Sequence, residues 1–447
     1  MAPFEPSEAT LRIVLLPDDG PERTECCNTR KGGDILAGYL EVFSESLVGV
    51  NITVVFQGII RTWRPSLNAQ PDHNATAEYK FLSETQEIEA TSSHRHRWEG
   101  LSVYRLPFAF TIPTELISSR SDVNPEYLTL PPTVREGQSY YGLATKQEYM
   151  QPRITYVITA VSTRFPRGTT SATKCRTKRE VTVMPSIPAS PPLQIEHFPH
   201  EYKTTCVKTL KRRVWNRPLG ELTISAAEPK AFNISTSAPR ASTVAAVKLL
   251  FQPCEAHTPA ATPYEWRLTV KSHLKVRTFY STTPFTQVPT KESVKSEPLA
   301  EMTSSCTYRE IRQCDTLSWR LHRLSSAGTI ASDTLATPWT TTLIVPVNAS
   351  KALIPTFLNP LSARRYVLVL HITVDKIHHE AIVLEVPVQV ICDPSQPATL
   401  SKRGASSETS RDGAEHQIAE GVGTMDLEDC HVPSLLDTTQ PPLYAAR

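Results

Sequence analysis

Apolar and polar residues alternate with a period of two along much of this chain, and this period constrains the fold more than any other feature of the sequence. Successive side chains of a β-strand point to opposite faces, so the pattern predicts strands that are buried on one side only. The stretch VNITVVFQG places Val50, Ile52, Val54 and Phe56 on one face, and YVLVLHITVD does the same with Tyr366, Leu368, Leu370, Ile372 and Val374. The stretches ITYVITAV, EWRLTVKSHLKV and AIVLEVPVQVI alternate in the same way.

Helical periodicity is close to absent. The best helix candidate is ASTVAAVKLLF, but its apolar, β-branched run fits a strand equally well. The chain holds 37 Pro against 16 Gly, and proline is poor inside helices but tolerated at strand ends, turns and linkers. We therefore predict an all-β fold made of antiparallel sandwiches.

Composition also suggests how the chain is divided. Its 447 residues are enough for two or three domains. Five prolines lie between residues 185 and 199, which predicts a stiff linker there between sandwich domains at 8–184 and 200–393. The stretch 394–447 has few large apolar residues and eight acidic against four basic ones, so we predict a disordered tail. The polar stretches 65–97 and 281–305 are predicted to be long loops.

The sequence indicates a cytoplasmic protein. The first 20 residues lack the basic and apolar regions of a signal peptide, and no apolar stretch approaches the roughly 18 residues of a membrane span. The nine cysteines show no CxxC pair or zinc spacing, so free thiols in a reducing compartment are expected. A formal net charge of +2 argues against a general binder of nucleic acid.

No pattern in the sequence points to catalysis. The motifs GxSxG, GxGxxG, Walker A and HExxH are missing. His94 and His96 in HRHRW lack a third metal ligand nearby and are interpreted as part of a solvated basic loop. KIHHE at 376–380 is interpreted as a hairpin turn, and the basic cluster at 211–217 as a charged strand edge. We expect no catalytic, cofactor-binding or metal-binding residues, and no enzyme.

A short motif near the end of the chain is the strongest indication of function. Residues 441–444 read Pro441, Pro442, Leu443 and Tyr444, which is the Pro-Pro-x-Tyr peptide bound by WW domains. For 37 Pro and 14 Tyr in 447 residues, chance predicts about 0.1 such tetrapeptides. The motif lies in the predicted disordered tail, and its prolines favour the polyproline II conformation that fits an aromatic groove. SPPLQ and LPPTV lack the tyrosine, so this is the single copy.

Several segments resemble arrestins, in particular the fungal α-arrestin type of trafficking adaptor. GGDILAGYLEVFSESLVGVNITVVFQG has the turn, the second Gly and the long strand of the arrestin N-domain, and LPFAFTIP resembles its Leu-Pro-Phe-x-Phe-x-Ile-Pro segment. LPPTV followed by ITYVITAVSTR resembles the next two pieces. In the second half, PTFLNPLSARRYVLVLHITV and LEVPVQVI are similar to C-domain segments. The likeness covers roughly residues 11–393 and is looser over 200–340.

The resemblance implies two arrestin-like, immunoglobulin-type sandwiches and an adaptor function. α-Arrestins use Pro-Pro-x-Tyr motifs to bring WW-containing HECT ubiquitin ligases to membrane cargo. The implied partners are thus such a ligase, ubiquitin and the cytosolic tails of transporters or receptors, at the plasma membrane or endosomes. No set of acidic and basic residues matches the polar core by which visual and β-arrestins sense receptor phosphate, so that switch is not carried over. Two alternatives stay open: an arrestin-fold trafficking scaffold without a ligase, and an extracellular β-sandwich binding module.

Overall fold

Strands form nearly the whole of the described structure. The computed structural model describes residues 10–16, 29–44, 46–64, 75–89, 94–98, 101–117, 125–135, 138–142, 147–164, 173–185, 195, 198, 200–212, 217–234, 241–254, 263, 266–314, 317–321, 337–349 and 353–392. Within these ranges the only α-helix is α1 (Lys291–Ser296), which is six residues long. None of the described helices is long and apolar enough to cross a membrane. The prediction of an all-β fold is confirmed.

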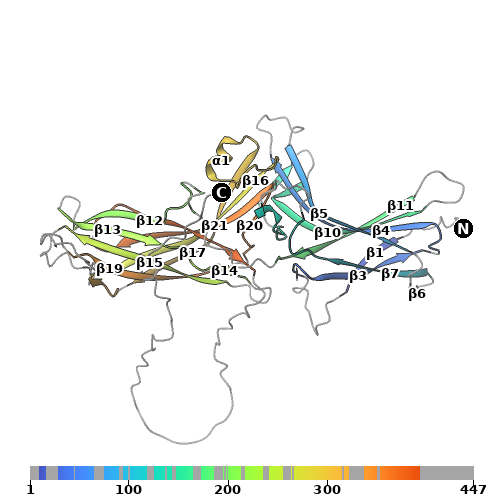
Figure 1. Ribbon diagram of the computed structural model, residues 1–447, viewed down its shortest axis with the longest axis horizontal. Coiled ribbons are helices and arrows are strands. Elements are labelled where there is room, and N and C mark those ends of the chain that lie inside the picture. Colours follow the sequence, from blue (N-terminus) through green and yellow to red (C-terminus); the bar gives the residue numbers. More distant parts are fainter. Residues whose placement is uncertain are drawn as a thin grey trace, which may run out of the picture. The chain divides into compact units, whose positions relative to one another are not determined.

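The first group of strands forms two larger sheets and a separate hairpin (Figure 1). Their bounds are β1 Thr10–Leu15, β2 Thr29–Arg30, β3 Ile35–Phe43, β4 Val50–Arg64, β5 Ala75–Ile88, β6 His94–Trp98, β7 Leu101–Thr111, β8 Gln138–Gly142, β9 Gln147–Gln151, β10 Arg153–Arg164 and β11 Thr173–Val183. The sheets run β1-β3-β7-β6 and β2-β11-β10-β4-β5, with β8-β9 apart. A short 3₁₀ helix, η4, covers Pro125–Leu128. Residues of both larger sheets share one core, among them Leu40, Phe56 and Tyr156.

The second group repeats this arrangement of sheets around a core. Its strands are β12 Thr205–Lys211, β13 Pro218–Ala226, β14 Phe232–Asn233, β15 Ser242–Pro253, β16 Leu268–Ser281, β17 Ala300–Cys314, β18 Arg320–Leu321, β19 Trp339–Asn348, β20 Phe357–Asn359, β21 Ser362–Val374, β22 Ile382–Val388 and β23 Val390–Ile391. One sheet runs β12-β13-β15-β19-β18; the other runs β17-β16-β21-β20, with β22 also paired to β21, and β14 pairs β23. Leu249, Leu274 and Leu368 belong to their common core.

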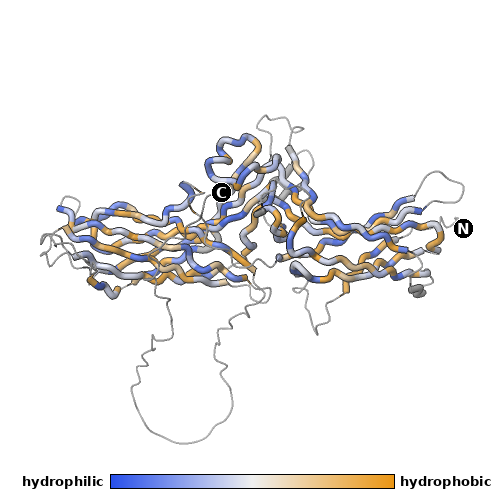
Figure 2. Tube along the Cα trace, in the orientation of Figure 1, coloured by the Kyte–Doolittle hydropathy of each residue, from blue (hydrophilic) through white to orange (hydrophobic). Residues whose placement is uncertain are grey.

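The alternating stretches form the strands that their period predicts. In β4, Ile52, Val54 and Phe56 are at most 2% exposed, and Figure 2 shows the same alternation of hydropathy along the strands. The ambiguous stretch 241–251 is a strand, β15, whose residues alternate between exposed and buried along its length. KIHHE lies in the connection between the antiparallel strands β21 and β22, which confirms the predicted hairpin turn.

Two predicted loops contain regular structure, and those predictions were wrong. The range 65–97 includes β5 and most of β6, and HRHRW is therefore a strand in place of a solvated loop. The range 281–305 includes α1 and the first residues of β17. Both β5 and β17 lie at the edge of a sheet. β5 buries Leu82 and Ile88 in the core but is otherwise largely polar, and part of β17 is exposed on both faces. Neither strand therefore shows the sustained apolar alternation from which a strand is recognised.

One glycine of the first group allows a close approach of neighbouring strands. Gly38 on β3 lies opposite Leu15 on β1 and Phe108 on β7. A Cβ atom at this position would overlap the carbonyl oxygen of Val14 and come within 2.8 Å of the Phe108 ring. The aromatic ring therefore takes the space that a side chain would fill.

Several predictions fall on residues that the structure does not describe. The linker 185–199 is described only at positions 185, 195 and 198, and the tail from residue 393 onward lies wholly outside the described residues. The boundaries at 8–184, 200–393 and 394–447 stay predictions.

Candidate functional site

The predicted WW-binding residues Pro441, Pro442, Leu443 and Tyr444 lie outside the described residues. Within the described part, the feature that stands out is a group of charged side chains buried in the second group of strands. Such burial is costly unless each charge finds a partner. This group is therefore the candidate site of the body.

Two arginines lie side by side on neighbouring strands. Arg277 on β16 is directly opposite Arg365 on β21, and the two residues are 1% and 5% exposed. Side chains alternate between the two faces of a strand. Because Leu274 and Val276 of β16 belong to the hydrophobic core, Arg277 points to the opposite, outer face of this sheet. Two buried guanidinium groups on adjacent strands repel each other and require anionic partners.

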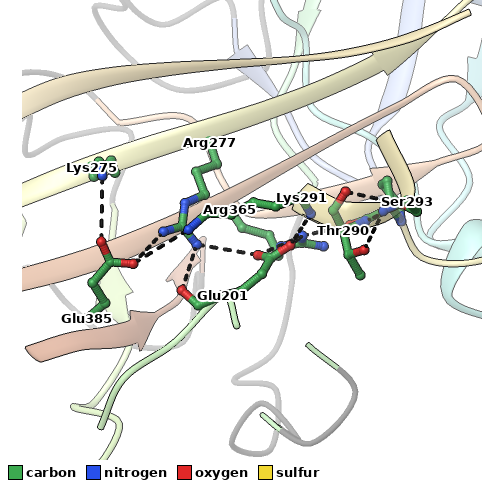
Figure 3. Close-up of polar contacts among 9 residues, drawn as sticks. Glu201, Lys275, Arg277, Thr290, Lys291, Ser293, Arg365 and Glu385 are labelled. Carbon is green, nitrogen blue, oxygen red and sulfur yellow. Dashed lines mark hydrogen bonds and ion pairs between the residues drawn. The ribbon is translucent and has the colours of Figure 1, made fainter. Parts of the chain in front are cut away.

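The carboxylate of Glu201 supplies that partner to both arginines (Figure 3). Arg365 Nη2 donates to the two carboxylate oxygens at 3.0 and 3.1 Å. Arg277 Nη1 donates to Oε2 at 3.4 Å and to the backbone carbonyl oxygen of Glu201 at 3.1 Å. The backbone N–H of Lys291 donates to Oε1 at 2.6 Å. The Glu201 carboxylate thus accepts from three separate segments of the chain.

A second carboxylate, Glu385 on β22, binds the other side of Arg277. Arg277 Nη2 donates to Glu385 Oε2 at 2.7 Å, and the ammonium groups of Lys275 and Lys291 each lie 3.7 Å from a Glu385 oxygen. Partial burial by itself would raise the pKa of Glu385, but the charges of Arg277, Lys291 and Lys275 outweigh it and hold that pKa below its usual range. We call Glu201, Arg277, Arg365 and Glu385 the arginine–glutamate cluster.

Aromatic rings cover the charges that carboxylates do not reach. The Arg365 guanidinium lies 4.5 Å from the ring centre of Phe198 and 4.3 Å from that of Phe279. Its Nε and Nη1 atoms find no hydrogen-bond acceptor in the described residues, so the ring faces stabilise that side of the cation. The Arg277 guanidinium lies 5.8 Å from the ring centre of Tyr202. Burial, opposed by the charges of Arg365 and Arg277, raises the pKa of Tyr202 to about 12.

The loop that leads into α1 is held by the same cluster. Thr290 caps the helix, since its Oγ1 accepts from the backbone N–H of Ser293 at 3.0 Å and Ser293 Oγ accepts from the Thr290 backbone N–H at 2.8 Å. This reciprocal pair is a capping box. Arg365 Nη2 also donates to the carbonyl oxygen of Pro289 at 2.7 Å. Together with the Lys291 N–H, these contacts anchor the loop against β21.

This geometry provides a structural anchor. It joins Phe198 and residues 200–202, at the end of the predicted linker 185–199, to strands β16, β21 and β22 and to the α1 loop. A left-handed residue, His200 with a φ of 64°, directly precedes Glu201. A positive φ costs a non-glycine residue energy. This conformation of His200 places Glu201 next to the two arginines.

The sequence did not reveal this cluster. Glu201 lies 76 residues from Arg277 and 164 residues from Arg365, so no local spacing connects them. A signal was nevertheless present: Arg277, Arg365 and Glu385 each occupy the polar position of an alternating strand. Charged residues at such positions on neighbouring strands are candidates for pairing.

Among the described residues, no three His, Cys, Asp or Glu side chains lie close enough together to bind a metal ion. His94 and His96 lie on β6. His379 accepts from the Val374 backbone N–H through Nε2 at 3.0 Å, which is a hydrogen bond within the hairpin turn.

A scan against protein-family models finds no match to this chain, and a search of curated proteins finds none either. The likeness to arrestins rests on the sequence segments quoted above.

Proposed function

We propose that this protein is a cytosolic adaptor that recruits a WW-domain HECT ubiquitin ligase to membrane transporters or receptors. The body would bind the cytosolic tail of the cargo, and Pro441, Pro442 and Tyr444 would bind the ligase. The adaptor makes no bond itself; it raises the concentration of ligase beside the cargo, which is then ubiquitinated and endocytosed. In this proposal the protein is not an enzyme and works at the cytosolic side of the plasma membrane or endosomes.

The Pro-Pro-x-Tyr sequence is the observation that carries this proposal. Its two prolines are pre-ordered for docking, and Tyr444 offers a ring and a hydroxyl to a second pocket. The all-β body and the arrestin-like segments agree with an adaptor of this kind. With one copy of the motif, there is no second site to add avidity, so we expect an affinity in the micromolar range or weaker, about −8 kcal/mol or less favourable.

The test compares the full-length chain with its Tyr444→Ala variant for binding to the WW domains of a HECT ligase, measured by isothermal titration calorimetry. We expect saturable binding of the wild type and loss of binding in the variant. A Pro191→Ala/Pro192→Ala variant serves as the matched control, because this Pro-Pro pair lacks the tyrosine. Equal binding by wild type and Tyr444→Ala would refute the proposal, as would no binding by either.

The alternative is a trafficking scaffold of the same fold that works without a ligase. It predicts that membrane-protein tails bind the body while the Tyr444→Ala substitution leaves both cargo binding and cargo ubiquitination unchanged in cells.

A further inference from the structure

Strand β17 lies at the end of its sheet and has one free edge. It ends the strand order β17-β16-β21-β20, so within the described residues it pairs with β16 alone. The pairing shifts register once, at Thr307, which lies opposite no residue of β16. Such a β-bulge interrupts an edge. The stretch 308–314 beyond it is a regular edge, whose outward N–H and C=O groups can bind a further strand.

The side chains of this stretch divide between the two faces of the sheet. Arg309, Ile311 and Gln313 lie on one face and are exposed, Ile311 to 61%. Arg312 and Glu310 lie on the other face. There the Arg312 Nε atom is 2.7 Å from the Glu310 carboxylate, and the two side chains are 38% and 28% exposed. The edge thus carries an apolar residue between a carboxylate and a guanidinium group.

The order of these residues is complementary to itself when two copies of the stretch run antiparallel. Opposite residues of an antiparallel pair share a face, so the two-fold axis between two identical strands passes through a residue. With the axis at Ile311, the two Ile311 side chains lie opposite each other, and Arg309 of each copy lies opposite Gln313 of the other. Glu310 of each copy then lies opposite Arg312 of the other, which gives two cross-strand ion pairs.

Other positions of the axis lose this agreement. An axis at Arg309, Glu310 or Arg312 places two identical charges directly opposite each other, which destabilises an antiparallel pair. An axis at Gln313 places Arg312 opposite Cys314 and leaves Glu310 beyond the end of the paired stretch. The charges along the edge therefore select one register and discourage pairing in the others.

We propose that this protein forms a two-fold symmetric dimer in which the 308–314 stretches of two copies pair as antiparallel strands. A contact through one short edge buries less than the roughly 1,200–2,000 Å² of a stable interface, so we expect a reversible dimer with a dissociation constant on the order of 10 μM. The dimer does not depend on the proposed function. Its consequence does: two chains would bring two Pro-Pro-x-Tyr motifs to tandem WW domains and so supply the avidity that one chain lacks.

Sedimentation velocity of the full chain measures the association, at concentrations from about 1 to 100 μM, a range that spans the expected dissociation constant. A reducing agent excludes dimers linked through the exposed Cys254 or Cys306. We expect the mean mass to rise from 49.7 kDa toward twice that value as the concentration increases. A mass that stays at 49.7 kDa over the whole range would refute the proposal.

Three variants test the register. Ile311→Asp places two carboxylates opposite each other on the axis, so we expect association to weaken at least about tenfold. Glu310→Arg and Arg312→Glu each place like charges opposite in both cross-strand pairs, so each variant alone should remain monomeric. An equimolar mixture of these two variants should associate as the wild type does, because every cross-strand pair then joins opposite charges. A variant that merely fails to fold would not regain association in the mixture.

The matched control is Glu78→Arg, which makes the same change of charge on an exposed side chain of another edge strand, β5. It should leave the association unchanged. Equal weakening by Glu78→Arg and Glu310→Arg would contradict the register, as would a mixture of Glu310→Arg and Arg312→Glu that stays monomeric. Unchanged association of Ile311→Asp would place the contact elsewhere on the molecule and overturn the proposal.

Amide hydrogen exchange distinguishes a second copy from other occupants of the edge. In the dimer, the outward N–H groups of 308–314 should become protected as the protein concentration rises over the same range. Slow exchange at every concentration would assign the edge to a segment of the same chain and refute a second copy. Tyr444→Ala should associate as the wild type does, so a failure of dimerisation and a failure of ligase binding are separate results.

Discussion

Replacing Glu201 with Gln tests whether the arginine–glutamate cluster anchors the chain. The substitution keeps the size of the side chain and one acceptor oxygen but removes the negative charge between Arg277 and Arg365. Both arginines are at least 95% buried, so neither can regain solvation without movement. We expect the segment 198–202 and the α1 loop to lose much of their stability against local opening.

The magnitude follows from the contacts. Glu201 accepts from Arg365 at 3.0 and 3.1 Å, from Arg277 at 3.4 Å and from the Lys291 backbone N–H at 2.6 Å. Removing one partner of a buried ion pair typically costs about 3–5 kcal/mol, since the remaining charge stays buried without compensation. Glu385 continues to bind Arg277, which places the expected cost near the lower end of this range, about 3 kcal/mol.

Amide hydrogen exchange, measured by mass spectrometry on the full chain, reports how stable each segment is against local opening. Phe357 and Leu361 of the second group belong to the core of the first, so a global midpoint would report the unfolding of the packed strands and not the local opening of one segment. We expect exchange in peptides covering 198–212 and 284–300 to accelerate by about 100-fold for Glu201→Gln, as about 3 kcal/mol requires. The matched control is Glu292→Gln, whose side chain is 56% exposed on α1 and should change exchange little. If these peptides exchange in Glu201→Gln as slowly as in the wild type, the cluster does not anchor the segment.

Three further predictions follow from the geometry. Gly38→Ala should lower the free energy of unfolding of the first group by about 1–3 kcal/mol, because the new methyl group meets strand β1 and the Phe108 ring; urea denaturation checks this, and an unchanged midpoint would contradict it. His200→Gly should stabilise the segment 198–202 by up to about 1 kcal/mol, since glycine adopts a positive φ without strain, and faster exchange in the variant would contradict it. Glu385 has a pKa held below its usual range by Arg277 and two lysines; its stabilising contribution is therefore present above about pH 4.3, the unfolded value, and is lost as the pH falls through the lower folded pKa. Glu385→Gln should accordingly be less stable than the wild type at pH 7, with the difference shrinking in acid as measured by urea titrations from pH 7 to 3.

The period of the apolar residues was enough to predict most interior strands. β4 and β21 are packed against a core on at least one face, so their sequences need apolar residues at alternating or at successive positions. The edge strands β5 and β17 show this pattern only weakly: β5 places Leu82 and Ile88 in the core among largely polar neighbours. In β17 the consecutive residues Ser304, Ser305 and Cys306 are all exposed, which means that both faces are wet and no period arises. A polar strand of this kind is distinguishable from a loop only through its backbone pairing with a neighbour.

The charged cluster was beyond the reach of sequence reasoning for a different reason. Which carboxylate meets Arg277 and Arg365 is decided by the path of the chain before β12 and by the left-handed turn at His200. Neither of these is encoded by a local pattern, since a histidine at a positive φ is unusual. The strand positions alone identify polar residues on the outer face of the sheet. They do not show that the segment 198–202 returns to cover that face and bury it.

The ion pairs of Glu385 differ in strength, and this difference decides which contact fixes its carboxylate. The Lys275 ammonium group lies 3.7 Å from the Glu385 carboxylate, whereas Arg277 lies at 2.7 Å and is almost fully buried (Figure 3). The shorter, less solvated ion pair is the stronger of the two. Losing Lys275 therefore leaves the contact that fixes Glu385, and the hydrogen bonds to the Glu201 carboxylate come from Arg277, Arg365 and Lys291. The cluster thus keeps its buried contacts when the exposed charge beside it is removed.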